Sequence, residues 1–561
     1  MPGGLLNMIA VGKANNILNE NPSKTFFKCV YAKYTNFGIQ KFRIDYNGSK
    51  ELRLNESSEF TFKIPRYGEL LLDNYLAIRL PDIWSPIYPP QSLTDTWKPY
   101  EFKWIKNLGT MCIEEITINI GGHIIQKFSG EYIHGIKIRD FSSKLNNFNE
   151  MIGNTKDLNE PENYLNREGY YPNSYYDASS EGSEPSIRSK YIYIPLSNFF
   201  SFTTKQAFPL VCLHYNELNI NIKIRPLKEL FTINDITNIS NDKYSRIQPN
   251  FNETEHAFYR FLQQPPSVTL TADDYKDKTT NFNSDIHLIS TYCFLSEDET
   301  KVFIKNDQSF LIKQVYESTH KNIVNSRKML IESNGMVPTW MWYLRRSDSY
   351  IKNEWSNYTN YNYEDEIPSN VVDENDDLVD LQNTLNNNNT LTIDNIYTYG
   401  PSINPDGSLT DIKISNTYNE ANFRKILTNF SVIYDGKNRE NEMNSDVYSF
   451  IEKYRNSRGS TLNNGLYYYN HCLLTSPYET QPSGAINLTK FNKVEIELKT
   501  ITPPIDTEAQ TLNICSEDGE LIGVNKNSWD IYQYTYDFKL FEERYNVLLI
   551  SNGTASLKFS L

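Results

Sequence analysis

The stretch Leu218-Asn219-Ile220-Asn221-Ile222-Lys223-Ile224 alternates strictly between apolar and polar side chains. Neighbouring side chains of a β-strand point to opposite faces, so this period of two places four branched apolar side chains on one face and polar groups on the other. The stretch therefore predicts a β-strand that buries one face in a core.

The same alternation recurs on both sides of this stretch. Residues 116–120 alternate, run into Gly121-Gly122 and continue at Ile124-Ile125, which predicts a β-hairpin with a tight turn. Further strands are predicted at residues 60–64, 191–195, 494–499 and 555–561.

Helical patterns are scarce and short. Residues 295–303 predict a short helix in which Ser296 is the N-cap and Glu299, three residues on, completes a capping box. Residues 446–455 predict a second one, because their apolar side chains recur at helical spacing. Neither is long enough for the crossover of a parallel sheet, so the chain is predicted to be all-β, in sandwiches or barrels with large loops.

One strand pattern occurs twice. Residues 216–223 resemble residues 492–499, and the two segments start about half the chain apart. Because each lies late in its half of the chain, the pair indicates two copies of one β domain.

Length and composition exclude several classes of protein. The chain has 561 residues and a mass of 65.4 kDa, which predicts two to four domains. Lys and Arg number 55 against 69 Asp and Glu, a net charge of −14, so a protein that coats nucleic acid through a basic surface is not expected. The aromatic share of 14% is too high for a disordered chain.

Cysteine usage and the terminal sequence indicate a protein made in a reducing compartment. The six cysteines are scattered without Cys-x-x-Cys spacing, so reduced, mostly buried thiols are expected. No apolar run is long enough to span a membrane, and the apolar start of the chain lacks the basic region of a secretory signal. The cysteines are Cys29, Cys112, Cys212, Cys293, Cys472 and Cys515.

Two segments predict long surface loops. Residues 143–190 hold little alternation, and residues 352–422 are rich in Asn and acidic residues. Asn-x-Thr sequons begin at Asn357 and Asn388, but without a secretory signal they are expected to be chance matches.

Motifs that carry chemistry are incomplete. Gly12-Lys13 resembles the end of a phosphate-binding loop, but the positions before and after it do not fit. The acidic run 373–377 lacks the glycine and the final glutamate of a calcium loop. The seven histidines are spread out, without metal-ligand spacing. We predict no catalytic, cofactor-binding or metal-binding residue and no enzyme activity; a β-sandwich hydrolase stays as a remote alternative, for which the sequence picks out no carboxylate pair.

A tryptophan-rich segment leaves a binding alternative open. Trp340 and Trp342 share one face of a predicted strand, either as core side chains or as a platform that stacks on sugars. A carbohydrate-binding β-sandwich protein used in attachment would need such a platform, with Trp340 or Trp355 as its candidate residue.

Short motifs spread along the chain form an ordered set. They include Gly3-Gly4-Leu5-Leu6, Thr25-Phe26-Phe27-Lys28, Gly68-Glu69-Leu70-Leu71, Gly130-Glu131-Tyr132, Phe208-Pro209-Leu210, Glu354-Trp355-Ser356-Asn357, Gln481-Pro482-Ser483-Gly484 and Tyr545-Asn546-Val547-Leu548. Together they resemble the major capsid proteins of nucleocytoplasmic large DNA viruses, and the long insertion and the composition look most like a mimivirus-type virus.

The resemblance implies a double jelly roll, that is, two eight-stranded antiparallel β-sandwiches in one chain with long loop insertions. It implies an N-terminal arm at residues 1–24, a first jelly roll at 25–258 and a second at 259–561 that carries the insertion at about 352–422. Three chains would form a homotrimer with a pseudo-hexameric outline, and such capsomers would tile the icosahedral shell of a giant virus.

The resemblance also implies partners and a location. The chain would contact itself, first within the trimer and then between trimers, as well as minor capsid and penton proteins. The arm, with Leu5, Leu6, Ile9 and Val11, would lie on the inner side, against neighbours or the internal viral membrane. The protein would be part of the outer shell of the virion, made and assembled in the host cytoplasm, without direct contact to nucleic acid and without a cofactor.

Overall fold

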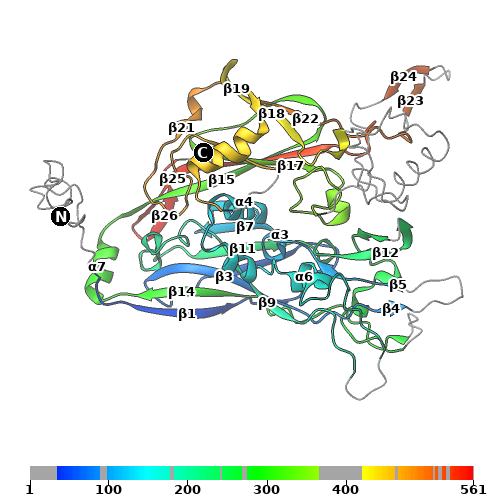
Figure 1. The fold of residues 1–561 in the computed structure, drawn as a ribbon. Coiled ribbons are helices and arrows are strands. Elements are labelled where there is room, and N and C mark those ends of the chain that lie inside the picture. The colour runs from blue at the N-terminus through cyan, green and yellow to red at the C-terminus, as the bar shows by residue number, and fades with distance from the viewer. Residues whose placement is uncertain are drawn as a thin grey trace, which may run out of the picture. The chain divides into compact units, whose positions relative to one another are not determined.

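The computed structural model describes most of the chain from residue 34 onward (Figure 1). The described residues are 34–88, 98–176, 182–240, 243–267, 274–365, 420–460, 465–509, 512–515, 521–525 and 531–559. The predicted arm at 1–24 and most of the predicted insertion lie outside them. The chain divides into two compact units, 1–38 and 39–561, and the fold described below is that of the second.

A first β-sandwich contains two antiparallel sheets (Figure 1). The strand order of one sheet is β1 (Gly38–Asp45), β14 (His287–Phe294), β3 (Leu70–Leu80) and β10 (Phe208–Pro209), with β9 (Lys190–Pro195) also paired to β3. The strand order of the other is β2 (Ser58–Lys63), β11 (Leu218–Ile224), β7 (Ile113–Ile120) and β8 (His123–Phe128).

A second β-sandwich follows in the chain. One sheet has the order β15 (Gln308–Ile323), β25 (Tyr536–Ser551), β17 (Met336–Arg346) and β20 (Leu466–Asn470), with β21 (Ile486–Asn487) paired to β17 and β26 (Thr554–Leu557) to β25. The other has the order β16 (Ser326–Leu330), β22 (Val494–Thr500), β18 (Leu427–Tyr434) and β19 (Lys437–Asn444).

The two sandwiches repeat the same topology. Eight main strands of each sandwich appear in the same chain order and in the same positions of the two sheets, which is the arrangement of a jelly roll. In the first sandwich they are β1, β2, β3, β7, β8, β9, β11 and β14, and in the second they are β15, β16, β17, β18, β19, β20, β22 and β25. Strands β11 and β22, which carry the repeated sequence pattern, both occupy the second position of their sheet. The predicted double jelly roll and the predicted duplication are therefore confirmed.

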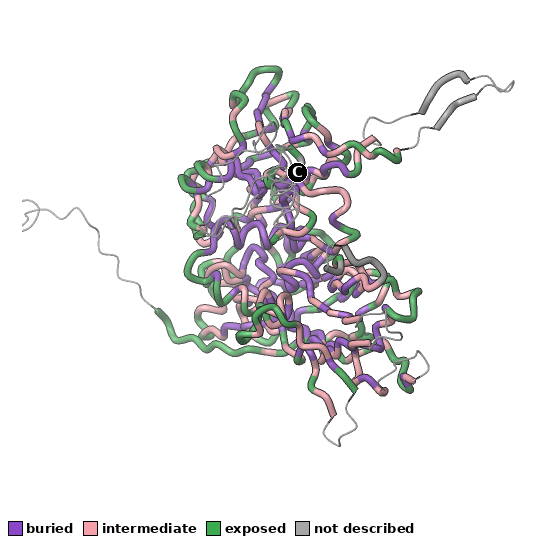
Figure 2. Tube along the Cα trace, turned by 45° about the vertical axis from the view of Figure 1, so that its right-hand side comes forward, coloured by how far each residue is buried: buried purple, intermediate pink, exposed green. Residues whose placement is uncertain are grey.

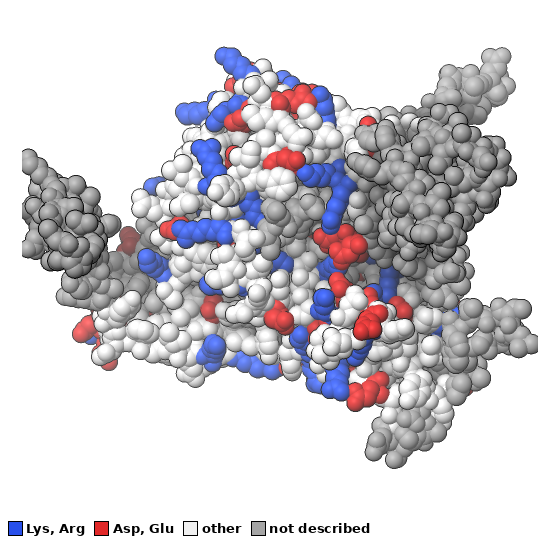
Figure 3. Space-filling model, in the orientation of Figure 1, with Lys and Arg blue, Asp and Glu red and all other residues white. Residues whose placement is uncertain are grey.

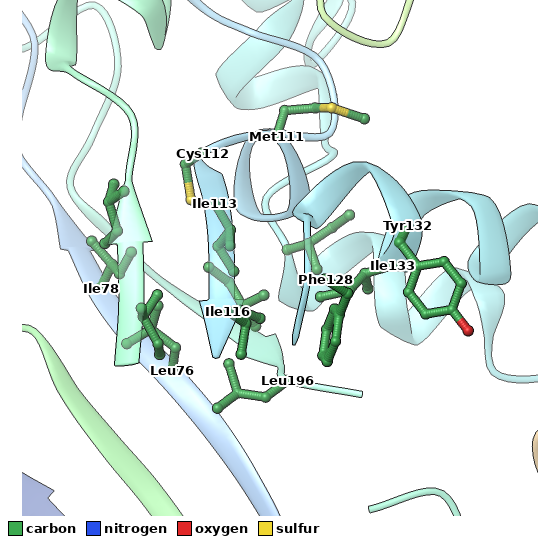
Figure 4. Close-up of a cluster of buried hydrophobic side chains, with 14 of the residues drawn as sticks. Leu76, Ile78, Met111, Cys112, Ile113, Ile116, Phe128, Tyr132, Ile133 and Leu196 are labelled. Atoms are coloured by element: carbon green, nitrogen blue, oxygen red, sulfur yellow. The ribbon is translucent and has the colours of Figure 1, made fainter. Parts of the chain in front are cut away.

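Strand β11, Leu218–Ile224, is buried on one face, as its alternating sequence predicts. The side chains at 218, 220, 222 and 224 in β11 are buried, and the residues between them are half-buried. In the same sandwich, Leu76 and Ile78 of β3 face Ile113 and Ile116 of β7 between the two sheets (Figure 4). Buried residues run in this way through both sandwiches (Figure 2).

The last strand of the first sandwich comes later in the chain than the sequence analysis placed it. Strand β14 pairs with β3, His287 opposite Ala77, so it belongs to the first sandwich although it follows residue 258. Its side chains are buried almost throughout, so its sequence does not alternate. We propose that the domain boundary lies after Phe294 rather than at 258.

The helices and loops agree only partly with the prediction. Both predicted helices are present, as α7 (Glu297–Lys305) and as η10 (Val447–Ile451), a π-helical turn, continued by α9 (Glu452–Asn456). Ser296 is the N-cap residue of α7, as predicted, but its hydroxyl donates to the Glu299 carboxylate at 3.4 Å instead of capping the helix backbone.

The segment 143–190 is more ordered than a surface loop. It contains α5 (Leu145–Met151), α6 (Lys156–Asn159) and a 3-10 turn, η1 (Pro161–Asn163), which bury Phe148, Ile152 and Leu158. These side chains join the core of the first sandwich, so the predicted surface excursion is wrong for this part.

The remaining short strands form small ribbons at the ends of the sandwiches. They are β4 (Ile87–Tyr88) with β5 (Lys98–Pro99), β6 (Lys103–Trp104) with β12 (Phe231–Ser240) and β13 (Lys243–Ile247), and β23 (Leu512–Cys515) with β24 (Leu521–Asn525). Cys112, Cys212, Cys293 and Cys472 are buried free thiols, as predicted, while Cys29 lies outside the described residues. Within the described ranges, no helix has both the length and the apolar character needed to cross a membrane.

Replacing Trp342 by alanine should destabilise the second sandwich strongly. The ring is fully buried and stacks on Phe430 with a centroid distance of 4.3 Å, so its loss leaves a large cavity, at a cost of about 3–5 kcal/mol. Denaturant unfolding measures this. The matched control is Tyr170→Ala, whose ring is 78% exposed and which should change stability by less than about 0.5 kcal/mol. Equal effects of the two substitutions would contradict the core assignment.

Candidate functional site: the junction between the two sandwiches

A buried helix joins the two sandwiches. Helix α4 (Gly130–Asp140) follows β8 of the first sandwich, and all eleven of its residues are buried. A Cβ atom on Gly130 would lie 1.8 Å from the Thr110 carbonyl oxygen, and one on Gly135 would lie 2.3 Å from Cε of Met341 on β17. The two glycines let α4 approach the first sandwich on one side and the second sandwich on the other.

Glu131, on the first turn of α4, lies among three cations. Its carboxylate accepts hydrogen bonds from Arg345 at 2.8 Å and from Lys539 at 2.6 Å, and Arg225 lies 3.8 Å away. The Tyr343 hydroxyl donates to it at 2.7 Å. Burial by itself would raise the pKa of Glu131, but the charges of Lys539, Arg345 and Arg225 hold that pKa well below its ordinary value. Glu131 is thus a buried anion whose counter-charges come mainly from the second sandwich.

Arg139, on the last turn of α4, makes an ion pair of the opposite direction, in which the helix supplies the cation and the second sandwich supplies the anion. Its Nη2 donates to Glu543 of β25 at 2.7 Å, and its Nε donates to Asp140 at 2.8 Å. Glu543 also accepts a hydrogen bond from Tyr132 at 3.0 Å and lies 3.3 Å from Lys313. Burial alone would raise the pKa of Glu543, yet the charges of Arg139 and Lys313 lower it to about 2. An anion and a cation of α4 therefore pair with opposite charges of the second sandwich, about two helical turns apart.

Backbone groups extend the junction along two strand edges. The Gln126 amide of β8 donates to the Lys313 carbonyl at 3.0 Å, and the Gln314 amide of β15 donates to the Ile125 carbonyl at 2.8 Å. The backbone N–H of Ser129 donates to the Glu317 carboxylate at 2.7 Å. These bonds set the register of β8 against β15.

A second contact is made by the segment that leads into the insertion. The Trp355 indole donates to the Glu229 carbonyl at 2.9 Å, and the Arg225 guanidinium lies 3.9 Å from the centre of its ring. The Asn353 amide donates to the carbonyls of Lys228 and Phe231, both at 2.7 Å. The segment is thereby tied to the first sandwich.

The residues proposed for a carbohydrate platform do not form one. Trp340 is fully buried in the core of the second sandwich, and Trp355 is only 8% exposed in the junction. Asn357, which begins one of the two sequons, is also buried, and its side chain closes a turn by donating to the Tyr361 carbonyl. The prediction that Trp340 or Trp355 forms the exposed aromatic platform of a carbohydrate-binding protein is therefore wrong. The second sequon, at Asn388, lies outside the described residues.

Sequence reasoning missed the junction. Only Gly130-Glu131-Tyr132 enters the sequence analysis, as a family motif, and the helix Gly130–Asp140 is not predicted, because a helix that is buried all round has no amphipathic period. Its partners lie more than 200 residues away in the chain, and no local pattern reveals such pairs. The usable local signal is the composition of residues 130–140, in which Glu, Lys, Arg and Asp stand among isoleucines and two glycines, a combination that indicates buried charges.

Comparison with known proteins identifies relatives along most of the chain. A family model described as major capsid protein N-terminus matches residues 25–263, and one described as large eukaryotic DNA virus major capsid protein matches residues 299–556. Probable capsid protein 4 of Acanthamoeba polyphaga mimivirus is 23% identical over 410 residues, which cover 63% of this chain and 74% of that protein. The major capsid protein of Invertebrate iridescent virus 3 is 22% identical over 501 residues, which cover 88% and 84%.

A solved structure shares the fold. The Faustovirus major capsid protein superimposes with a TM-score of 0.58 at 12% identity, over 94% of this chain and 93% of that chain. In three further relatives the matched part spans only 48% to 58% of their own length. The resemblance found in the sequence is confirmed.

Replacing Glu543 by glutamine should remove a pH-dependent part of the stability. Because the folded pKa of about 2 lies below the ordinary value of 4.5, the charge stabilises the fold fully above about pH 4.5 and its contribution is lost as the pH falls towards 2. The variant should be less stable than the parent by about 3 kcal/mol at pH 7, with a gap that closes towards pH 2. Urea unfolding across this range measures the gap.

The control for this measurement is Glu217→Gln. Glu217 pairs with Lys63 on the surface, and its side chain is 56% exposed, so its loss should cost less than about 1 kcal/mol at every pH. A gap for Glu543→Gln that does not change with pH would show that its charge does not hold the junction.

Proposed function

The chain belongs to the family of major capsid proteins of large eukaryotic DNA viruses, and we propose that three copies of it assemble into a pseudo-hexameric capsomer that tiles an icosahedral shell. In this proposal the protein works by assembly and catalyses no reaction. Each copy contributes two of the six jelly rolls of a ring.

The observation that carries the proposal is the charged junction around α4. A capsomer with a regular outline needs its two jelly rolls held at one angle, and a junction free to flex would give each trimer a different shape. Paired buried charges resist such flexing, because any movement that separates Glu131 from Arg345 or Arg139 from Glu543 leaves a charge unpaired away from water. The rigid double sandwich is suited to be a repeated building block.

The charge distribution supports a shell protein rather than a genome-binding one. The net charge is −14, and on the face drawn in Figure 3 Lys and Arg alternate with Asp and Glu. A protein that holds nucleic acid by its phosphates would gather its cations in one patch or stripe. In the virion we place the chain in the outer shell, without direct contact to the genome.

Further partners belong to the same proposal. Trimers would contact one another, minor capsid proteins and penton proteins through smaller contacts, whose number makes a closed shell stable. The arm at 1–24 would reach these partners or the internal viral membrane. Buried free thiols such as Cys112 suit synthesis and assembly in the host cytoplasm, where cysteines stay reduced.

Light scattering on the purified protein tests the trimer. The expected mass is three times 65.4 kDa, because an obligate assembly of this kind buries an extensive apolar surface and leaves few free copies. Negative-stain images of the same sample should show particles with a six-cornered outline. A stable monomer at micromolar concentration, or an even-numbered assembly, would contradict the proposal.

A further inference from the structure

The two sandwiches contribute different elements to the junction inside the chain. The first sandwich contributes the helix that follows its strand β8, whereas the second contributes outward-facing side chains of β17 and β25. Because both sandwiches have the same topology, each also carries the half of the contact that the other uses. The first sandwich retains the outer face of β3, and the second retains the helix that follows β19. A contact between unlike surfaces can continue from copy to copy and close into a ring.

The helix after β19 exposes apolar side chains. Residues 447–456 lie between β19 and β20, as α4 lies between β8 and β9. Phe450, Ile451 and Tyr454 are 39%, 57% and 93% exposed. On α4, Glu131, Gly135 and Arg139 touch the second sandwich at intervals of four residues, with Tyr132 beside Glu131, and Phe450 and Tyr454 repeat the four-residue spacing. Large apolar side chains gathered on one helix face indicate a surface that another protein covers.

The outer face of β3 matches that of β17 position by position. Both strands have 11 residues, and both show a register shift against the neighbouring strand near their start. Counting from the C-terminal side of this shift, where Asp73 corresponds to Thr339, Tyr75, Ala77 and Arg79 of β3 correspond to Met341, Tyr343 and Arg345 of β17. These three residues of β17 are the ones that contact α4.

This face of the first sandwich is partly accessible: Tyr75 is half-buried and Ala77 is buried between its neighbours, and other features of the face fit a helix. Arg79 is exposed, and its guanidinium makes no hydrogen bond or ion pair with any described side chain. Beside it on β9, Tyr191 and Tyr193 are each 37% exposed and stack with a centroid distance of 6.1 Å. A groove of about 330 Å³ lies next to Tyr75, with apolar walls from Phe148, Met151, Phe202 and Tyr478.

We infer that the helix at 447–456 of one copy packs on the outer face of β3 and β9 of a second copy, in the way that α4 packs on β17 within the chain. Phe450 stands at the position of Gly135, and because its side chain is large the helix lies farther from the strand than α4 does, with the ring in the groove beside Tyr75. Asp446, one turn before Phe450, takes the place of Glu131; it pairs with Lys425 of its own chain, and the contact brings this ion pair beside Arg79. The inference rests on the proposed trimer and specifies the surfaces that form it.

Chemical cross-linking tests this contact. Ile451→Cys and Tyr193→Cys are made in separate chains, the two chains are coexpressed, and the product is treated with a short bismaleimide. Covalent dimers are expected only when both variants are present, because the contact joins unlike surfaces. A single chain with both cysteines should give covalent species that end at three chains. The parent protein controls for its own cysteines, and Ile451→Cys with Tyr215→Cys, whose tyrosine is 80% exposed on another part of the surface, controls for random linking.

A substitution that needs no cross-linker gives an independent readout. Ile451→Lys places a cation among the apolar side chains of this contact and should raise the protein concentration needed for assembly by more than about tenfold, as for other central interface residues. Circular dichroism should show an unchanged fold, and Tyr215→Lys should assemble like the parent.

The outcomes separate this contact from the trimer itself. A parent protein that does not assemble refutes the proposed function and this inference together. A parent that forms trimers in which positions 451 and 193 are not linked, or in which Ile451→Lys assembles normally, refutes only the contact. Linking of Ile451→Cys chains to one another would show a two-fold contact and would overturn the inference.

Discussion

Two oppositely directed charge pairs around one buried helix fix the geometry of this molecule. Glu131 of α4 faces cations of the second sandwich, and Arg139 of the same helix faces the anion Glu543. Glu131, Arg139 and Glu543 are out of reach of water and have to keep their partners, so the helix can neither slide along β17 and β25 nor turn on them without a large cost. A single pair would allow rotation about itself, whereas two separated pairs do not. The two jelly rolls therefore behave as one rigid block, and Met341, Tyr343 and Phe541 of the second belong to the hydrophobic cluster that contains the core of the first.

The duplicated topology gives this junction a wider meaning. Two copies of one sandwich, joined by a contact between unlike surfaces, are one step of a series that either closes into a ring or continues as a fibre. The two sandwiches that meet at the junction inside the chain are parts of one polypeptide, so this junction forms without an association step and can include charges that are costly to bury. The proposed contact between chains has to form from separate molecules, and it offers the exposed side chains of Phe450, Ile451 and Tyr454 on one side and of Tyr191 and Tyr193 on the other.

Sequence reasoning reached the strands and the fold but not the junction. Alternation revealed β11 and β22 because each buries one face and leaves the other half-exposed. It failed for β14, which is buried on both faces, so this strand was not predicted. It failed for α4 for the same reason, since a helix surrounded by protein has no polar side. The pairing of Glu131 with Lys539 depends on how two distant parts of the chain meet, which no local pattern contains.

Alternatives built on single residues failed for a related reason. The sequence around Trp340 and Trp355 is compatible with an exposed platform. Only the packing places Trp340 in a core and Trp355 against the guanidinium of Arg225. The family resemblance carried the functional conclusion, and the structure adds the physical reason why such a chain can act as a building block.

A cryo-electron microscopy reconstruction of the assembled particle tests the central claim most directly. The quantity to measure is the rotation that superimposes the first sandwich on the second within a chain, compared with the rotation that superimposes the second sandwich on the first sandwich of the next chain. The account predicts the same rotation for both, about 60°, as six equivalent steps of a closed ring require. Two clearly different rotations, or a two-fold axis between the chains, would contradict it.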